Sequence, residues 1–329
     1  MEYLMKLFFL ILTLVILSVG NKEVFPTGLV KPLVDTDWVA KNLDHLAIID
    51  VRSESHSFYK NPVYEKNTKT GKWDLVKLGG HIPGAQLVLY EKVRGKKIIK
   101  GKEVNYILPG KTAFEELMQN AGINQNSHIV VVTNAEDIYD ITMASRMYWQ
   151  IKYYGHDDVS ILDGGTAQWL IDGRDVSTIL ENTPKGNWQA SDINMSLLAS
   201  SDEVLAAIDK ESIQIVDVRS LGQYLGTYKS SKVSEKGHIP TAKLYPIDLV
   251  TTRYTPIRFS SKSDLSQLTN ALNIDTDNET ITYCNSGHMA SGAWFAFYEL
   301  LGMKNSKLYD GSMHQWTIEK RPVVRMKIE

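Results

Sequence analysis

The sequence predicts an α/β protein made of two tandem domains, each a parallel sheet flanked by helices. Its length of 329 residues leaves room for two domains of roughly 100–200 residues each. The second half of the chain repeats landmarks of the first half in the same order. Within each half, short runs rich in isoleucine and valine alternate with helical patterns. The composition, 43% apolar and 22% charged, is typical of an ordinary globular protein.

The internal repeat consists of four segment pairs. The pairs share, in order, an Asp-Val-Arg strand, a Gly-His-Ile-Pro turn, a strand-like apolar run and an Asp-Gly turn followed by Gln-Trp. The matches are residues 47–52 with 214–219, 80–83 with 237–240, 129–134 with 280–284, and 162–169 with 309–316. The spacing between partners shrinks along the chain, so we expect extra loop residues in the first copy. One long period, far above the ~20–50 residues of solenoid units, indicates a duplicated domain.

The apolar runs are the expected strands. They comprise residues 47–51, 128–133 and 159–163 in the first copy and 214–218, 280–284 and 307–310 in the second. Residues 113–120 and 202–208 show helical patterns. Continuous apolar strands separated by helices indicate parallel sheets that are buried on both faces. Ligands of such sheets bind beyond the carboxyl ends of the strands, so we look for a site after residues 133 and 284.

The chain divides into a signal peptide at residues 1–20, a first domain at 21–180 and a second domain at 181–329, with the linker inside residues 176–194. Lys6 precedes an apolar run at residues 7–17 and small residues at 18–20. This order is typical of a secretory signal, and the run is shorter than the ~20 residues of a spanning helix. An uncleaved N-terminal anchor is the alternative. We expect a periplasmic or secreted protein that contacts a membrane only through this segment, if at all.

The net charge argues against a nucleic-acid-binding protein, and the cysteine content argues against a disulfide-stabilised one. With a net charge of -2 and no long basic run, nucleic acid is not an expected partner. The single cysteine, Cys284, rules out an intramolecular disulfide, so we expect two hydrophobic cores to stabilise the fold. A lone thiol is unusual in an exported protein, which makes Cys284 a candidate for chemistry.

The loop after the second-copy strand carries that cysteine. It contains Cys284, Asn285, Ser286, Gly287, His288 and Met289 and runs into an aromatic-rich helical pattern at residues 292–301. The first turn of a helix has unpaired N–H groups that favour negative charge, and cysteines placed there ionise more readily than the usual pKa of about 8.5. Gly287 lets the loop curl so that its amides form an anion-binding nest. Buried, inert packing of Cys284 is the structural alternative.

These landmarks together resemble the tandem-domain rhodaneses, the family of thiosulfate and 3-mercaptopyruvate sulfurtransferases. The resemblance rests on both Asp-Val-Arg strands, both Gly-His-Ile-Pro turns, Leu108-Pro109-Gly110, the Asp-Gly turns and the Cys284 loop. It implies a non-catalytic first domain and a second domain whose Cys284 carries a persulfide. The first copy then places Asn134, or Thr133 with a one-residue shift, where the second has Cys284.

The resemblance also implies the reaction. Sulfur passes from a small donor, thiosulfate or 3-mercaptopyruvate, through Cys284 to a thiol or cyanide acceptor, with no metal or organic cofactor. Ser286 and Gly287 match the mercaptopyruvate type, whereas Asn285, His288 and Met289 depart from it. The expected substrate-binding residues are Lys232, Gln223, Arg219 and His81. Because Gln223 and Lys232 replace family arginines, and Arg binds a carboxylate differently from Gln and Lys, the donor stays open.

Several residues have two interpretations. Arg253 and Arg258 supply replacement charge or are surface arginines. His288 gives a proton to the leaving group or is a loop residue, and Ser286 binds substrate or caps the helix. The histidines His81 and His238 recur in both copies, as do the ion pairs Asp50–Arg52 and Asp217–Arg219. Recurrence in an inactive copy favours structural roles for them.

Two other functions fit the same loop. A cysteine-dependent phosphatase needs an arginine six residues after the cysteine, where this chain has Ala290, so this function is disfavoured. A sulfur-relay or redox-sensing module without turnover fits the loop as well as an enzyme does. An assay of Cys284→Ser against the wild type distinguishes them.

Overall fold

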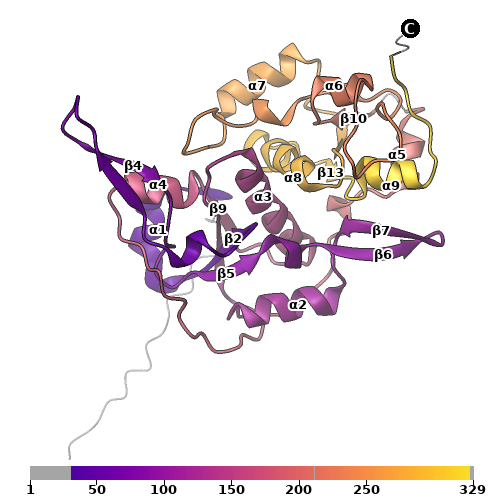
Figure 1. Ribbon diagram of the computed structural model, residues 1–329. Helices are drawn as coiled ribbons and strands as arrows, with labels where there is room; N and C mark the ends of the chain where they lie inside the picture. The colour runs from indigo at the N-terminus through magenta and orange to yellow at the C-terminus, as the bar shows by residue number, and fades with distance from the viewer. Residues whose placement is uncertain (1–30, 211, 327–329) are drawn as a thin grey trace, which may run out of the picture.

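The computed structural model describes residues 31–210 and 212–326, which form two α/β units in tandem (Figure 1). The predicted fold class is confirmed. The strands and α-helices of the first unit are β1 (Leu33–Val34), α1 (Thr36–Asn42), β2 (Leu46–Arg52), β3 (Val63–Lys66), β4 (Trp73–Lys77), β5 (Gln86–Leu89), β6 (Gly95–Ile99), β7 (Lys102–Ile107), α2 (Lys111–Asn120), β8 (His128–Val132), α3 (Ile138–Tyr153), β9 (Val159–Leu162) and α4 (Gly165–Ile171).

The second unit repeats this plan with fewer elements. They are α5 (Ser201–Ala207), β10 (Ile213–Asp217), α6 (Leu221–Leu225), β11 (Lys243–Leu244), α7 (Lys262–Ala271), β12 (Glu279–Tyr283), α8 (His288–Phe295), β13 (Ser306–Leu308) and α9 (Ser312–Ile318). A π-helical turn over Ala296–Leu301 continues α8. Short 3₁₀ turns at Leu43–His45, Ser57–Tyr59, Tyr90–Val93, Met195–Leu197 and Ile247–Leu249 complete the two units.

Both main sheets are parallel and share one topology. The strand order is β1-β9-β8-β2-β5 in the first unit and β11-β10-β12-β13 in the second. Leu198 forms an isolated parallel bridge to Leu308, as β1 does to β9. Strand β8 is buried along its whole length and β12 nearly so, as expected for parallel strands covered on both faces. The carboxyl ends of β8 and β12 are therefore equivalent positions.

The extra residues of the first copy form two antiparallel hairpins, β3–β4 and β6–β7. This confirms the expected loop insertions. The β6–β7 hairpin extends from the first unit along α9 of the second (Figure 1). There the amide of Asn105 donates to Nε2 of His314 at 3.2 Å. The hairpin thus ties the two units together.

Each unit has an apolar cluster of its own, around Trp169 in the first and Trp316 in the second, and a further cluster, which the sequence did not predict, joins the two units. One continuous apolar cluster contains both Met147 of α3 and Trp294 of α8, and these two helices pack directly on each other. Almost the whole of α3 is buried, because its own sheet covers one side and α8 the other. Fully burying a large apolar side chain stabilises a protein by about 1.5–3 kcal/mol, so the interface contributes to stability as a core does. The cysteine loop, which precedes α8, lies at this interface.

The predicted linker region, residues 176–194, contains no helix or strand apart from an isolated bridge at Ser177. Much of it packs on the first unit. Trp188 is fully buried, and its amide donates to the carbonyl of Ile123 at 3.0 Å. The predicted signal peptide at residues 1–20 lies outside the described residues. Among the helices that the structure describes, none has the length and hydropathy needed to cross a bilayer.

Candidate active site

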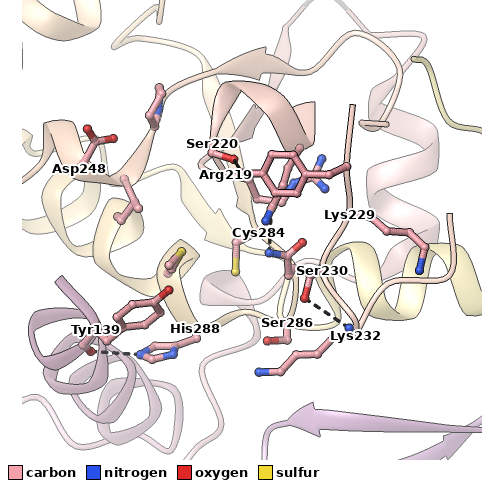
Figure 2. Close-up of a pocket in the computed structure, with 16 residues that line it drawn as sticks. Tyr139, Arg219, Ser220, Lys229, Ser230, Lys232, Asp248, Cys284, Ser286 and His288 are labelled. Atoms are coloured by element: carbon pink, nitrogen blue, oxygen red, sulfur yellow. Dashed lines mark hydrogen bonds between the residues drawn. The ribbon is translucent and has the colours of Figure 1, made fainter. Parts of the chain in front are cut away.

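Cys284 lies at the corner where β12 ends and the loop into α8 begins. Its residue exposure is only 2%, yet the side chain borders a cavity of about 440 Å³. Figure 2 shows its sulfur between Arg219 and Ser286, open to the space that the surrounding side chains enclose. Inert packing away from any cavity is therefore not what the structure shows. The loop residues Asn285, Ser286, His288 and Met289 border the same cavity.

Gly287 makes the tight turn of the loop. It is the N-cap of α8, with a left-handed φ of 72°. A Cβ atom built there would lie 2.5 Å from the carbonyl oxygen of Asp310 and 3.0 Å from Nη1 of Arg146. Only glycine fits this backbone conformation and this space without strain.

Ser312 holds the two ends of the loop. Its hydroxyl accepts hydrogen bonds from the amides of Cys284 at 3.1 Å and Gly287 at 3.0 Å, and it donates to the carbonyl of Tyr309 at 2.9 Å. Ser312 is not among the residues predicted from the sequence. The signal was available, because the repeat matches Ser312 with Gly165, which has no hydroxyl.

The remaining amides of the loop are open. Helix α8 has no side-chain cap. The N–H groups of Asn285, Ser286, His288 and Met289 donate to no acceptor within the described part of the chain. Unpaired amides at a helix start favour a bound anion, so the loop has the chemistry of the predicted anion nest.

Positive charge dominates the cavity wall. Arg219, Lys229 and Lys232 border the cavity, and Asp248 is the one carboxylate among the described residues that line it. The Nζ of Lys232 has no hydrogen-bond acceptor in the described structure and lies 4.5 Å from the centroid of the Tyr106 ring. Burial lowers the pKa of Lys232, the cation of Arg94 lowers it further, and charge on Cys284 opposes both. The cavity therefore suits an anionic ligand.

Arg219 has a structural duty as well as a place in the cavity wall. Its Nε and Nη2 donate to Asp217, and Nη2 also donates to the carbonyl of Gly237 at 2.8 Å. Burial opposes the charge of Arg219, but the Asp217 carboxylate outweighs burial and raises the pKa. Arg52 makes the same contacts with Asp50 and Gly80 in the first unit, so the predicted strand-end ion pairs are confirmed.

Gln223 reaches the cavity but is committed to the loop. Its Oε1 accepts from Nδ2 of Asn285 at 2.9 Å. The pair joins α6 to the residue that follows Cys284. Gln223 therefore supports the loop at a position where the family resemblance suggests an arginine that binds substrate.

His288 is half-buried and uncharged near neutral pH. Burial lowers its pKa well below the usual value, and the cations of Arg94, Arg146 and Lys232 act in the same direction. Its Nε2 lies 3.2 Å from the carbonyl oxygen of Tyr139, and a dashed line marks this contact in Figure 2. Because a carbonyl only accepts, Nε2 carries the proton and donates it there. This bond to α3 matches the structural interpretation of His288 better than proton donation to a leaving group.

Four residues that the sequence analysis weighed lie elsewhere. His81 does not line the cavity, which corrects its assignment to substrate binding: its ring stacks on Phe58 at 3.6 Å, and Nδ1 lies 3.1 Å from the Phe58 carbonyl. His238 stacks on Tyr224 in the same way, so both histidines are structural. Arg253 is exposed and faces Asp248, whereas Arg258 pairs with Asp163 of the first unit at 2.9 Å; neither replaces the missing arginines at Cys284.

Two arginines of the first unit contact the loop, and neither was predicted from the sequence. Arg94 donates to the carbonyl of Ser286, and Arg146 donates to the carbonyl of Gly287. No motif of the repeat includes either residue, because the contacts cross the interface. No group of three or more metal-ligating side chains with suitable geometry occurs among the described residues.

The first unit has Thr133 where the second has Cys284. The amide of Thr166 donates to the carbonyl of Thr133, just as the amide of Met313 donates to that of Cys284. One residue later, the amides of Ala167 and His314 donate to the carbonyls of Asn134 and Asn285, so Asn134 and Asn285 are equivalent as well. Of the two alignments considered, the one-residue shift is correct.

Comparisons with known proteins agree with this geometry. The rhodanese-like domain model matches residues 35–172 and 200–319. A protein of Saccharopolyspora erythraea named "Putative thiosulfate sulfurtransferase" is 31% identical over 291 residues, which cover 87% of this chain and 92% of that protein. The sulfur carrier protein TtuD of Thermus thermophilus is 30% identical over 294 residues, covering 86% and 93%.

A solved structure extends the comparison to three dimensions. The 3-mercaptopyruvate sulfurtransferase SseA of Escherichia coli superposes with a TM-score of 0.68 at 26% identity, covering 86% of this chain and 99% of that one. The chain belongs to the rhodanese-like family and is a sulfurtransferase with two rhodanese domains.

Proposed function

We propose that this sulfurtransferase moves sulfur from a small anionic donor, 3-mercaptopyruvate or thiosulfate, to a thiol or cyanide acceptor through a persulfide on Cys284. One observation carries the proposal. The only thiol of the chain borders a cation-rich cavity, at a loop in which the amides of Asn285, Ser286, His288 and Met289 have no acceptor among the described residues.

In the first half-reaction the Cys284 thiolate attacks the outer sulfur of the donor. An S–S bond forms to Cys284, and the bond between that sulfur and the rest of the donor breaks. Its electron pair leaves with sulfite, or with the pyruvate enolate, which then takes a proton. Nucleophilic catalysis of this kind divides one difficult transfer into two easier steps.

The persulfide carries its negative charge on the outer sulfur. Open amides at the start of α8 would stabilise that charge with no reorganisation of the loop. In the second half-reaction the acceptor nucleophile attacks the outer sulfur, and the electron pair of the S–S bond returns to Cys284. Because both steps use one nucleophile, we expect ping-pong kinetics.

Lys232 is the best placed residue to receive the anionic end of the donor. Its ammonium group has no competing acceptor within the described structure, whereas the guanidinium of Arg219 is shared with Asp217. A lysine binds an anion as a point charge and not through a bidentate contact. The side chain therefore favours neither donor by geometry, and charge attracts both.

Intact-mass spectrometry after exposure to each donor separately tests the proposal. We expect a gain of one sulfur atom on the wild type with at least one donor, and its loss on addition of cyanide or a thiol. Cys284→Ser is the matched control, because the chain has no other cysteine. A wild type that gains no sulfur from either donor would contradict the proposed donors.

A sulfur carrier is the second candidate, favoured by the similarity to TtuD, a protein named as a sulfur carrier. A carrier accepts sulfur from a protein persulfide and turns over small donors slowly or not at all. Incubation with a persulfidated partner protein distinguishes the two. Loading from the partner but from neither small donor would favour the carrier.

We also propose that the protein acts outside the cytoplasm, on the strength of the sequence pattern of residues 1–20. Cell fractionation with an antibody to the second domain tests this. N-terminal sequencing of the mature chain shows whether residues 1–20 are cleaved or retained as an anchor. Recovery of uncleaved protein in the cytoplasmic fraction would contradict export.

A further inference from the structure

Arg94 of the first unit makes three different contacts at the interface. Nε donates to the carbonyl of Tyr106 at 2.9 Å and Nη1 to the hydroxyl of Tyr90 at 2.7 Å. Nη2 donates to the carbonyl of Ser286, across the interface. Residues of the first unit thus fix the guanidinium plane of Arg94, and one edge of this group binds the Cys284 loop of the second unit.

Arg146 approaches the same loop from α3. Its side chain is fully buried, and the guanidinium lies 4.8 Å from the centroid of the Trp149 ring. Nη1 donates to the carbonyl of Gly287 at 3.2 Å and to Oδ1 of Asp310 at 2.5 Å. The other oxygen of Asp310 accepts from the amide of Leu108 at 2.7 Å, so this contact is also locked by first-unit backbone.

The two arginines determine where the loop amides point. In a planar trans peptide the C=O of one residue and the N–H of the next point in opposite directions. With the Ser286 oxygen on Arg94, the Gly287 N–H is directed to Ser312. With the Gly287 oxygen on Arg146, the His288 N–H is directed away from the first unit, and it has no acceptor among the described residues.

We infer that Arg94 and Arg146 are positioning residues: the silent first unit holds the peptides on both sides of Gly287 in the orientation that the anion nest of Cys284 needs. The inference rests on the proposed function in that the nest acts on a thiolate or persulfide. Neither arginine lines the Cys284 cavity, so both act through the loop and not on the substrate.

Arg258 provides a matched control. It makes an ion pair across the same interface, from the second unit to Asp163 of the first, at 2.9 Å. Asp163 also accepts from the amide of Phe259 at 3.0 Å, just as Asp310 accepts from that of Leu108. This pair mirrors Arg146–Asp310 but lies away from Cys284. Substitution of the arginine in either pair should therefore weaken the interface. Only substitution of an arginine that binds the loop should change the reactivity of Cys284.

The experiment compares Arg94→Met, Arg94→Lys, Arg146→Lys and Arg258→Met in the full chain. The first readout is the rate of alkylation of Cys284 by iodoacetamide against pH, which needs no sulfur donor and reports one thiol. The second is kcat and KM for persulfide formation. Thermal unfolding checks that each variant is folded. If Arg94→Met does not fold, Arg94→Lys takes its place in the comparison.

We expect Arg94→Met to move the midpoint of the alkylation profile to higher pH and to lower kcat by about 10-fold, with KM changed less than about 2-fold, because a misdirected amide stabilises charge poorly. Arg94→Lys should recover part of both effects, and Arg146→Lys should resemble Arg94→Met. Arg258→Met should leave both readouts within about 2-fold of the wild type.

The inference is overturned if folded Arg94 variants alkylate and turn over like the wild type, or if Arg258→Met changes both readouts as much as they do. Failure of the proposed function looks different. In that case the wild type gains no sulfur from the donors, while the alkylation profiles still separate the variants.

Discussion

The loops after β8 and β12 occupy the same corner of two parallel sheets, but among the described residues only the first loop has amides that donate to carboxylates. The backbone frames agree closely: Gly165 and Ser312, the equivalent residues that follow the next strand, have φ values of 51° and 50°. In the first loop, however, the amide of Glu136 donates to Asp140 and that of Asp140 donates to Asp137. Two amides of this segment thus donate to carboxylates of the same segment.

The Cys284 loop differs in length and charge as well. Ile138 begins α3 five residues after Thr133, whereas His288 begins α8 four residues after Cys284. The longer loop carries Glu136 and Asp137 and would repel an anion. The first unit therefore differs from the second in more than the missing thiol, because its own acids accept from amides near the corresponding helix start.

The largest effect is expected from moving the thiol. Cys284→Ser should abolish sulfur loading, and adding Thr133→Cys in that background should not restore it, because the acids of the first loop oppose negative charge and already accept from the amides of Glu136 and Asp140. Intact mass after donor treatment measures both variants. A gain of sulfur at residue 133 would show that the thiol alone distinguishes the two loops.

Gly287→Ala should reduce kcat on the order of 100-fold, the scale of losing one backbone donor to a developing charge. The left-handed φ costs on the order of 1–3 kcal/mol for a residue with a Cβ, and the contact with Asp310 forces the loop to move. Steady-state kinetics and denaturant unfolding measure the two effects. Gly173→Ala is the control, since Gly173 also has a positive φ but has open space around it; equal losses of activity in both variants would contradict a specific role for the loop.

Ser312→Ala should lower kcat by about 10-fold and stability by about 1–3 kcal/mol, because two buried amides lose their acceptor. Ser312→Gly removes the same hydroxyl but relieves the left-handed backbone and copies Gly165. We expect equal activity from the two variants and higher stability from the glycine. Should the glycine variant keep full activity, the hydroxyl is not what holds the Cys284 loop.

The smallest effect on activity is expected from the acids of the loop after β8. Burial raises the pKa of Asp140 to about 7. A hydrogen bond from the Glu136 amide lowers this pKa, whereas the charges of Asp137 and Glu136 raise it further. A raised carboxyl pKa means that the folded state binds the proton more tightly, so this group costs stability as pH rises from about 4 to 7 and costs most above 7.

Asp140→Asn should therefore be more stable than the wild type at pH 8, on the order of 1–4 kcal/mol, and nearly equal to it at pH 4. Thermal unfolding across this range measures the difference, with the exposed Asp277→Asn as the control. Activity should not change. A stability difference that is the same at pH 4 and pH 8 would show that Asp140 is not held protonated by its surroundings.

Local pattern and repetition were enough to predict much of this protein from its sequence. A buried parallel strand appears in the sequence as a continuous apolar run, and a duplicated domain appears as matching segments in the same order. A cysteine between such a run and a helical pattern indicates a reactive thiol. These signals are contiguous in the chain, which is why the two units and the loop from Cys284 to Met289 were found in advance. Family comparison then supplied Lys232 and Gln223, and both do border the cavity.

Contacts between distant segments were decided only in three dimensions. Arg94 and Arg146 lie about 140–190 residues from the carbonyls that they bind, and no local pattern encodes which peptide a guanidinium will meet. His81 shows the converse: its motif is clear, but stacking on Phe58 keeps it out of the cavity. The sequence by itself determined two sheets and one thiol, whereas packing of α3 against α8 decided which side chains orient the amides around it, because hydrogen bonds depend on distance in space and not along the chain.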